Sequence, residues 1–386
     1  MISKIIISFL LLNTYLLNAQ IEELSFGTED TFDVMTWNIE HFPKNGQTTV
    51  NYVSSIIEAL AVDIIAVQEV ENINYFEQMV GGLESYSGYL ESSWFAGLAY
   101  IYNHEVIEIN DIYEIYTSSQ YWSAFPRAPM VMDLNYLNNR IIVINNHLKC
   151  CGDGILDISD SGDQETRRYQ ANLLLKEYID SNFPNEKVIM LGDLNDDLTD
   201  IPQNNVFQMF LSDSENYLFT DYDVASGTSS NWSFPTWPSH LDHIMITNEL
   251  FNEFAQNDSE ILTIKIDEYL SGWSEYDENI SDHRPVALKL KMEPNLSVND
   301  LLNSNYSFHN TPNPFQSETS FILKDTFENQ RIEIYNMNGQ KIVSFKNILN
   351  QQFISWKAEG LPNGIYIAKL ISNNHHISTT KIVLMN

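Results

Sequence analysis

The sequence predicts a layered α/β domain with sheets at its centre, followed by a small all-β domain. Apolar strand-like runs alternate with helix-like segments over residues 31–292, which is typical of layered α/β proteins. A segment rich in Asn, Ser and Pro follows at residues 293–314, and repeated β-type alternation fills residues 315–386. We therefore expect a first domain, a linker and a second domain over these three ranges.

The strands of the first domain are expected where short runs rich in Ile, Val, Leu or aromatic residues stand near polar or turn residues. These runs are Asp33–Trp37, Ile64–Val67, Leu98–Tyr102, Ile141–Asn145, Val188–Leu191, Ile244–Ile246 and Val286–Leu290. Two segments, Val53–Leu60 and Arg168–Ile179, instead place apolar residues at helical spacing. This interleaving predicts helices packed against central sheets.

Turn signals separate the strands of the second domain. Asn338-Gly339 predicts a hairpin, and Pro362-Asn363-Gly364 predicts another turn. Residues 305–386 hold 7 basic and 5 acidic residues, whereas residues 1–304 hold 13 basic and 47 acidic residues. The change in charge supports a domain boundary between them.

The overall charge is strongly negative, with 20 Lys and Arg against 52 Asp and Glu and a formal net charge of −32 over 386 residues. A protein that wraps nucleic acid non-specifically usually shows a basic face, so this composition argues against such a role. It does not exclude a nuclease that meets phosphate through bound cations.

The N-terminus has the three-part pattern of a secretory signal, with Lys4, an apolar run from Ile5 to Leu12, and Ala19 before the expected cleavage point. We therefore expect residues 1–19 to be a signal peptide and no stable membrane span, because the apolar run is shorter than a bilayer requires. The adjacent Cys150 and Cys151 leave two alternatives open, a vicinal disulfide or two reduced thiols.

Short polar motifs stand at the ends of the predicted strands. Hard oxygen ligands suit Mg²⁺ or Mn²⁺, with Ca²⁺ also possible, and a His beside an Asp suits a general base. The candidate residues are Asn38 in "TWNIEHF", Glu69 in "AVQEV", His147 in "INNHLKC", Asp193 and Asn195 in "IMLGDLND", Asp242 in "SHLDHIMITN", and Asp282 and His283 in "SDHRPVAL".

These motifs, in this order, resemble the endonuclease/exonuclease/phosphatase superfamily, which includes deoxyribonuclease I. The resemblance covers residues 31–292 and implies a four-layer α/β sandwich, with two central mixed sheets flanked by helices. It implies that Asn38, Glu69 and Asp282 bind or support a metal ion. His283 is then the general base that Asp242 orients. Asp193 and Asn195 position the nucleophile and phosphate, and His147 stabilises the transition state.

Three arginines are candidates for substrate binding. Arg127 in "FPRAPMVMDL" resembles an arginine of the deoxyribonuclease branch. Arg167 and Arg168 begin a helix near the site and either hold phosphate or are ordinary surface arginines. The active-site tyrosine of several nucleases in the superfamily is missing, since Phe95 or Ala96 stands near that place.

The acidic segment after Cys151 is expected to be a solvated loop. Asp157, Ser159, Ser161 and Gly162 fit the first half of a calcium loop, but Arg168 stands where its closing Glu is required. Trp232, Trp237 and Trp273 are candidates either for the mouth of a cleft or for packing.

The C-terminal motifs "TPNPF", "IEIYNMNGQKI" and "LPNGIYIAKL" resemble the type A sorting domain of the type IX secretion system of Bacteroidetes. The alternative is a carbohydrate-binding or adhesive module. The resemblance implies a β-sandwich, a secreted or cell-surface location, and the secretion machinery as a partner.

The sequence thus predicts a secreted, metal-dependent phosphoesterase, expected as a monomer, with nucleic acid as the favoured substrate. A phosphatase or sphingomyelinase-like lipid phosphodiesterase of the same fold is the alternative. A catalytically inactive surface binding protein is the second alternative.

Overall fold

The structure is a computed structural model that describes residues 21 and 23–90, 97–295, 308–323, 331–346, 353–372 and 375–385. The predicted signal peptide, and Phe95 and Ala96, lie outside these residues. The chain forms two compact units, Met1–Pro294 and Asn295–Asn386. No helix in the described ranges combines the length and apolarity needed to cross a bilayer.

The first unit is built on twelve strands. They are β1 Phe32–Phe42, β2 Ile64–Val70, β3 Tyr86–Tyr89, β4 Gly97–Asn103, β5 Glu108–Glu114, β6 Met130–Tyr136, β7 Asn139–His147, β8 Lys187–Asp193, β9 Tyr217–Phe219, β10 Asp242–Thr247, β11 Glu260–Thr263 and β12 Val286–Leu290. One sheet has the order β11-β12-β1-β2-β4-β3 and the other β5-β6-β7-β8-β10-β9. Each is mixed, because β1–β2 and β7–β8 are parallel while the remaining pairs are antiparallel.

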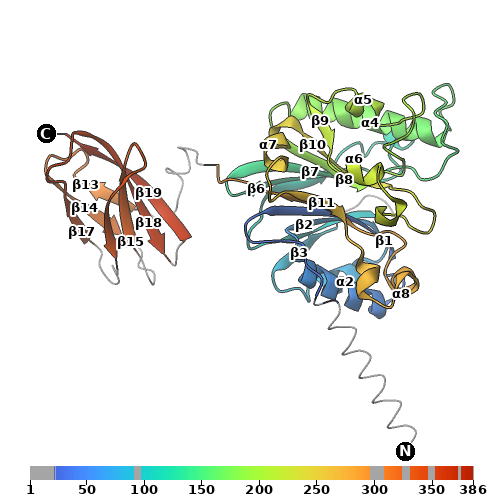
Figure 1. Cartoon of the computed structure of the whole chain (residues 1–386), viewed down its shortest axis with the longest axis horizontal. Helices are drawn as coiled ribbons and strands as arrows, with labels where there is room; N and C mark the ends of the chain where they lie inside the picture. Colours follow the sequence, from blue (N-terminus) through green and yellow to red (C-terminus); the bar gives the residue numbers. More distant parts are fainter. Residues whose placement is uncertain are drawn as a thin grey trace, which may run out of the picture. The chain divides into compact units, whose positions relative to one another are not determined.

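Helices cover the outer face of each sheet (Figure 1). The helices in the described part of this unit are α2 Gln47–Leu60, α3 Ile73–Val80, α4 Gln164–Asn182, α5 Gln208–Leu211, α6 Tyr222–Ala225, α7 Phe251–Phe254 and α8 Trp273–Asn279. α7 is an exception, because Phe251 and Phe254 pack against the core between the two sheets. α2 and α8 lie on the side of the β1 sheet, and α4 and α5 on the side of the β7 sheet. The predicted four-layer α/β sandwich is confirmed.

The alternation of side chains along each strand produces the layers. On β1, Val34 packs between the two sheets, whereas its neighbour Met35 packs outward against the α2 side. Both are fully buried, as expected for a strand covered on both faces. This is why the central strands read as continuous apolar runs in the sequence.

Every predicted strand and both predicted helices of this unit are present, within longer elements. The sequence analysis missed β3, β5, β6, β9 and β11. β3, β5, β9 and β11 are edge strands, and β5 carries only exposed or half-buried side chains, so it lacks the apolar run that marks a buried strand. In β6, the polar residues Asp133 and Asn135 interrupt the apolar residues, so this strand also lacks a continuous apolar run.

The second unit contains two antiparallel sheets, with orders β13-β14-β17 and β16-β15-β18-β19. Their strands are β13 Phe308–Thr311, β14 Glu318–Leu323, β15 Arg331–Asn336, β16 Lys341–Lys346, β17 Phe353–Lys357, β18 Gly364–Ser372 and β19 His375–Leu384. The Asn338-Gly339 hairpin joins β15 to β16, with Gly339 at φ 76°. β13 pairs with β14. Its residues, 308–311, fall within the range 293–314 that was expected to be the linker.

Candidate active site

The polar motifs converge at one edge of the two sheets. β1, β2, β7 and β8 end at this edge, while β10 and β12 run the opposite way and begin there. The register places Asp193 beside both His147 and Asp242. Motifs that are far apart in the sequence therefore meet, because strand direction decides which end of each strand reaches the edge.

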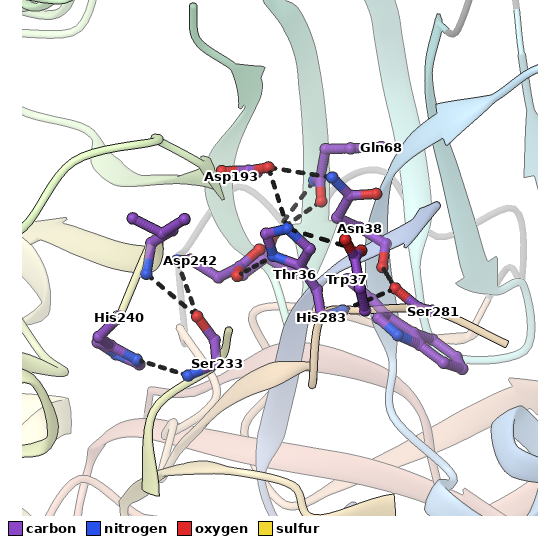
Figure 2. Close-up of polar contacts among 12 residues, drawn as sticks. Thr36, Trp37, Asn38, Gln68, Asp193, Ser233, His240, Asp242, Ser281 and His283 are labelled. Carbon is purple, nitrogen blue, oxygen red and sulfur yellow. Dashed lines mark hydrogen bonds and ion pairs between the residues drawn. The ribbon is translucent and has the colours of Figure 1, made fainter. Parts of the chain in front are cut away.

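His283 and Asp242 form a buried pair at the centre of this edge (Figure 2). The His283 Nδ1 lies 2.7 Å from the Asp242 Oδ2. The other ring nitrogen, Nε2, lies 3.8 Å from Asp193 and 3.9 Å from Asp282 and makes no hydrogen bond to any residue that the structure describes. Burial disfavours the charged ring, but the Asp242 and Asp193 carboxylates outweigh burial and raise the pKa of His283 to about 10.

Asp193 lies opposite His283 and is almost completely buried. Burial raises the pKa of Asp193 to about 7, and the Asp242 and Glu69 carboxylates add to the increase while His283 opposes it. The His147 Nε2 lies 3.5 Å from the Asp193 Oδ2. Burial, followed by the positive charge of Arg127, lowers the pKa of His147 well below its usual value, so this ring is neutral.

Asn38 connects two of the carboxylates. Its Nδ2 donates to Asp193 at 3.0 Å and to Glu69 at 3.2 Å, and its Oδ1 accepts the Glu40 N–H. The Asn38 amide therefore holds the Glu69 and Asp193 carboxylates in place. Glu69 has a positive φ of 63° beside an irregularity between β2 and β4, which turns its side chain into the pocket.

Asp282 is the most exposed of the catalytic carboxylates, with 29% of its side chain accessible. Its backbone N–H donates to Glu40, which also pairs with Lys44. Burial raises the pKa of Asp282 to about 6, with His283 opposing the increase and Glu40 adding to it. Glu40 therefore holds the Asp282 loop in place and also increases the negative charge around it.

The loop after β8 depends on close backbone packing. Gly192 has a φ of 145°, and a Cβ at this position would lie 2.0 Å from the Asn146 carbonyl oxygen. Asn195 has a φ of 57°, donates its backbone N–H to Asp193 and donates its side-chain amide to the Leu148 carbonyl. The "GDLND" motif thus places Asp193 and Asn195 beside β7.

These side chains line an open pocket of about 590 Å³. Acidic groups dominate its lining, and Arg168 is the only Lys or Arg among the lining residues. The acidic lining residues are Glu40, Glu69, Glu165, Asp193, Asp196, Asp197, Asp200 and Asp282.

The donor set fits a divalent cation. Glu69 and Asp282 present carboxylates to the pocket, and their oxygens are ligands that Mg²⁺ or Mn²⁺ prefer. Asp193, Asp242 and His283 also form a compact group of possible ligands. The short contact between Asp242 and the His283 Nδ1 shows that this carboxylate fixes the orientation of the ring.

The three arginines predicted to bind substrate are engaged elsewhere or lie outside the pocket lining. Arg168 is buried and donates to Asp196 and to the carbonyls of Lys149 and Cys151, so its donors hold the protein's own loop. Arg167 donates to the Ser123 carbonyl and lines a separate small pocket. Arg127 does not line the active pocket, although its charge acts on His147.

Other predicted features divide between the pocket and the core. Cys150 and Cys151 line the pocket as free thiols, with their Sγ atoms 2.9 Å apart. Trp237 lines the pocket with 79% of its surface exposed. Trp273 instead packs against Arg284 and Tyr276, and Trp232 donates to the Val224 carbonyl.

Sequence reasoning missed the groups that support His283. Ser281 accepts the His283 N–H and donates to the Asn38 carbonyl, and Tyr276 donates to the His283 carbonyl. Arg284 makes two bonds of 2.7 Å to Asp267. Only Ser281 left a local signal, because a Ser two residues before the backbone N–H that it binds is a common turn pattern.

A four-layer α/β sandwich with a His–Asp pair and a group of carboxylates at one sheet edge is typical of a class of phosphoesterase. The model of the "Endonuclease/Exonuclease/phosphatase family" matches residues 35–283, and the chain belongs to this family. The model of the "Secretion system C-terminal sorting domain" matches residues 311–385, which indicates type IX secretion to the cell surface or the extracellular space.

Solved structures match the chain at low sequence identity. D. rerio TDP2 with a single-strand DNA product has a TM-score of 0.51 and 12% identity, over 68% of this chain and 100% of that chain. The human Nocturnin catalytic domain with bound sulfate has a TM-score of 0.49 and 16% identity, over 68% of this chain and 95% of that chain. An endonuclease/exonuclease/phosphatase from Bacteroides vulgatus has a TM-score of 0.48 and 17% identity, over 68% of this chain and 99% of that chain. No curated protein sequence matches the chain.

Proposed function

We propose that the chain is a secreted, metal-dependent phosphodiesterase that acts as an extracellular endonuclease. The observation that carries this proposal is the orientation of His283. Asp242 holds its Nδ1, while its Nε2 points between Asp193 and Asp282 without a hydrogen bond to any described residue. A ring held in this way can accept a proton from water.

In the proposed reaction, the His283 Nε2 takes a proton from a water molecule as the water oxygen attacks phosphorus in line with the leaving oxygen. The bond from phosphorus to the leaving oxygen breaks as the new P–O bond forms. Asp193 and Asn195 orient the water and the phosphate. Neutral His147 donates a hydrogen bond to the phosphoryl group, whose negative charge increases in the transition state.

Glu69 and Asp282 would hold the cation, with Asn38 fixing the Glu69 carboxylate. A bound divalent cation would neutralise phosphoryl oxygens and offset the carboxylates that raise the His283 pKa. The acidic pocket needs such compensation, because a phosphodiester would otherwise meet a surface of its own sign.

The acidic lining also favours a second candidate. A small phosphoester carries less charge into the pocket than a polynucleotide does, so a phosphatase or a lipid phosphodiesterase of the same fold remains the competing activity. The exposed Trp237 favours nucleic acid, since an aromatic ring at the mouth of a pocket can stack on a base.

The test is a panel of plasmid DNA, RNA, bis-p-nitrophenyl phosphate, sphingomyelin and phosphomonoesters, assayed after EDTA treatment with Mg²⁺, Mn²⁺ or Ca²⁺ restored. We expect EDTA to abolish DNA cleavage and Mg²⁺ or Mn²⁺ to restore it. Glu69→Gln should raise the metal concentration for half-maximal activity by at least about tenfold. Glu71→Gln is the matched control, because Glu71 pairs with His41 and does not line the pocket.

DNA cleavage that survives EDTA and is unchanged in Glu69→Gln would contradict the metal-dependent mechanism. Cleavage of phosphomonoesters or sphingomyelin alone would replace the nuclease with the second candidate. No hydrolysis with any substrate and metal would favour an inactive surface binding protein.

A further inference from the structure

A group of three carboxylates lies where the loop after β7 meets the start of α4, and one of them, Glu165, lines the pocket. Asp153, Asp163 and Glu165 each offer a carboxylate oxygen, and these oxygens all lie within 4.8 Å of one another. Asp153 is exposed and Asp163 half-buried, whereas only 2% of Glu165 is accessible. Like charges this close repel, so the arrangement requires a compensating positive charge.

The buried carboxylate of Glu165 is only half satisfied. Its Oε1 accepts the Gly154 N–H at 2.7 Å and lies 3.4 Å from Arg168. Its Oε2 is buried and has no hydrogen-bond partner among the described residues. Burying a charged oxygen without a partner is unfavourable, so this atom points to a ligand.

Arg168 does not supply the missing partner. Its Nε donates to Asp196, and its NH1 group donates to the carbonyls of Lys149 and Cys151. The remaining contact of its guanidinium is with the Glu165 oxygen that already has a donor. Within the described residues, Arg168 therefore forms an ion pair with only one of the three carboxylates, Glu165.

The chain also makes room for the Glu165 carboxylate. Gly152 has a φ of 125°, and a Cβ there would lie 2.0 Å from the Glu165 Oε1 and 2.5 Å from its Oε2. Only glycine lets the backbone approach the carboxylate this closely. The loop is thus built around a buried negative charge.

We propose that Asp153, Asp163 and Glu165 bind a Ca²⁺ ion that fixes this loop against α4. Hard carboxylate oxygens suit calcium, and calcium accepts the irregular geometry of a loop more readily than magnesium does. The partial calcium-loop pattern of Asp157, Ser159, Ser161 and Gly162 does not supply these three carboxylates. Asp157 instead accepts hydrogen bonds from the backbone and hydroxyl of Ser159.

The site has a consequence for the active pocket. Cys150, Cys151, Gly152, Gly154 and Glu165 line one wall of that pocket. A bound calcium ion orders this wall without taking part in hydrolysis. The inference is therefore independent of the proposed function.

The test uses the full secreted chain, stripped with EDTA and then titrated with Ca²⁺ in the presence of excess Mg²⁺ to occupy the catalytic carboxylates. Isothermal titration calorimetry should give one calcium equivalent. The midpoint of thermal unfolding should rise by about 5 °C or more when calcium is at about a hundredfold excess over its Kd. His283→Ala should give the same calcium response as the unmodified chain.

Glu165→Gln and Asp153→Asn should each lose the calcium equivalent and the thermal shift. Gln at position 165 keeps an acceptor for the Gly154 N–H, and Asp153 is exposed, so at least the second variant should fold normally. Asp160→Asn is the matched control in the same loop and should behave as the unmodified chain. Equal calcium binding in all variants, or no calcium binding by the unmodified chain, would overturn the proposal.

Discussion

Two clusters of histidine and aspartate lie close together in the first unit and differ in how their polar atoms are used. In the first cluster, Asp242 holds the Nδ1 of His283, whose Nε2 has no hydrogen bond to any described residue. The second cluster joins Asp221 to His240 and His243, and all three residues are fully buried. Ser233 connects the clusters, because it accepts the Asp242 N–H and donates its own N–H to His240 (Figure 2).

Every ring nitrogen of the second cluster is engaged. His240 accepts the Ser233 N–H and therefore donates from Nε2 to Asp221. His243 donates from Nδ1 to Asp221 at 2.5 Å and from Nε2 to the Asp196 carbonyl at 2.9 Å. A ring that donates from both nitrogens is an imidazolium, so His243 and Asp221 form a buried ion pair.

The difference teaches how to distinguish a catalytic pair from a structural one. Proximity of His to Asp is the same in both clusters. The first cluster leaves the His283 Nε2 without a hydrogen bond to any described residue, and His283 lines the pocket. The structural cluster satisfies all its nitrogens and joins the loop after β8 to β10.

The largest effect should come from removing the base. His283→Ala should reduce hydrolysis by about 10²–10⁴-fold with little change in the thermal midpoint, because the ring acts on water and not on the core. Initial rates with bis-p-nitrophenyl phosphate or DNA measure this. His104→Ala, at an exposed histidine near β3, is the control, and equal rates for the two variants would contradict the assignment.

The two aspartates should separate activity from stability. Asp221→Asn leaves the His243 charge buried without its partner and should lower the free energy of unfolding by about 3–5 kcal/mol. Asp242→Asn should cost less stability, because Asp193 still faces His283 and this ring lines the pocket, but it should reduce the rate by about 100-fold or more, because His283 loses its orienting carboxylate. Urea denaturation and initial rates on both variants test the contrast, which fails if both variants lose the same property.

The buried ion pair should also make stability depend on pH. The Asp221 carboxylate raises the pKa of His243 against the effect of burial, and the two histidines lower the pKa of Asp221 although burial opposes this. The stability from His243 is fully present below about pH 6.5 and is lost as pH rises through its higher folded-state pKa. The stability from Asp221 is present above about pH 4 and is lost as pH falls.

The unfolding free energies of the unmodified chain and His243→Gln should therefore differ most between about pH 4 and 6.5 and converge at alkaline pH. Chemical denaturation across this range is the measurement. A difference that stays constant up to pH 10 would show that His243 is neutral in the folded protein.

The smallest effect should come from Trp237, the exposed aromatic residue that lines the pocket beside the His283 cluster. Trp237→Ala should raise KM for DNA by about fivefold or more through lost base stacking, while kcat for bis-p-nitrophenyl phosphate stays the same. Steady-state kinetics with both substrates separates these effects. An equal loss with both substrates would mean that Trp237 shapes the pocket and does not bind a base.

The buried strands and the polar motifs beside them could be predicted from the sequence. Strands covered on both faces leave continuous apolar runs, and carboxylates or histidines directly next to such runs are conspicuous. For this reason the sequence alone predicts Glu69, Asp193 and His283 as site residues. Edge strands such as β5 were not, since half-exposed side chains leave no run to detect.

The sequence by itself determined the order of the layers, the family motifs and the C-terminal sorting domain. Only the tertiary structure decided which polar groups meet, which of them keep atoms without a partner, and that Arg168 holds a loop and does not reach for substrate. The reason is physical. Local sequence sets periodicity and turn chemistry, whereas the pairing of side chains distant in the chain depends on strand direction, register and competition for each hydrogen bond.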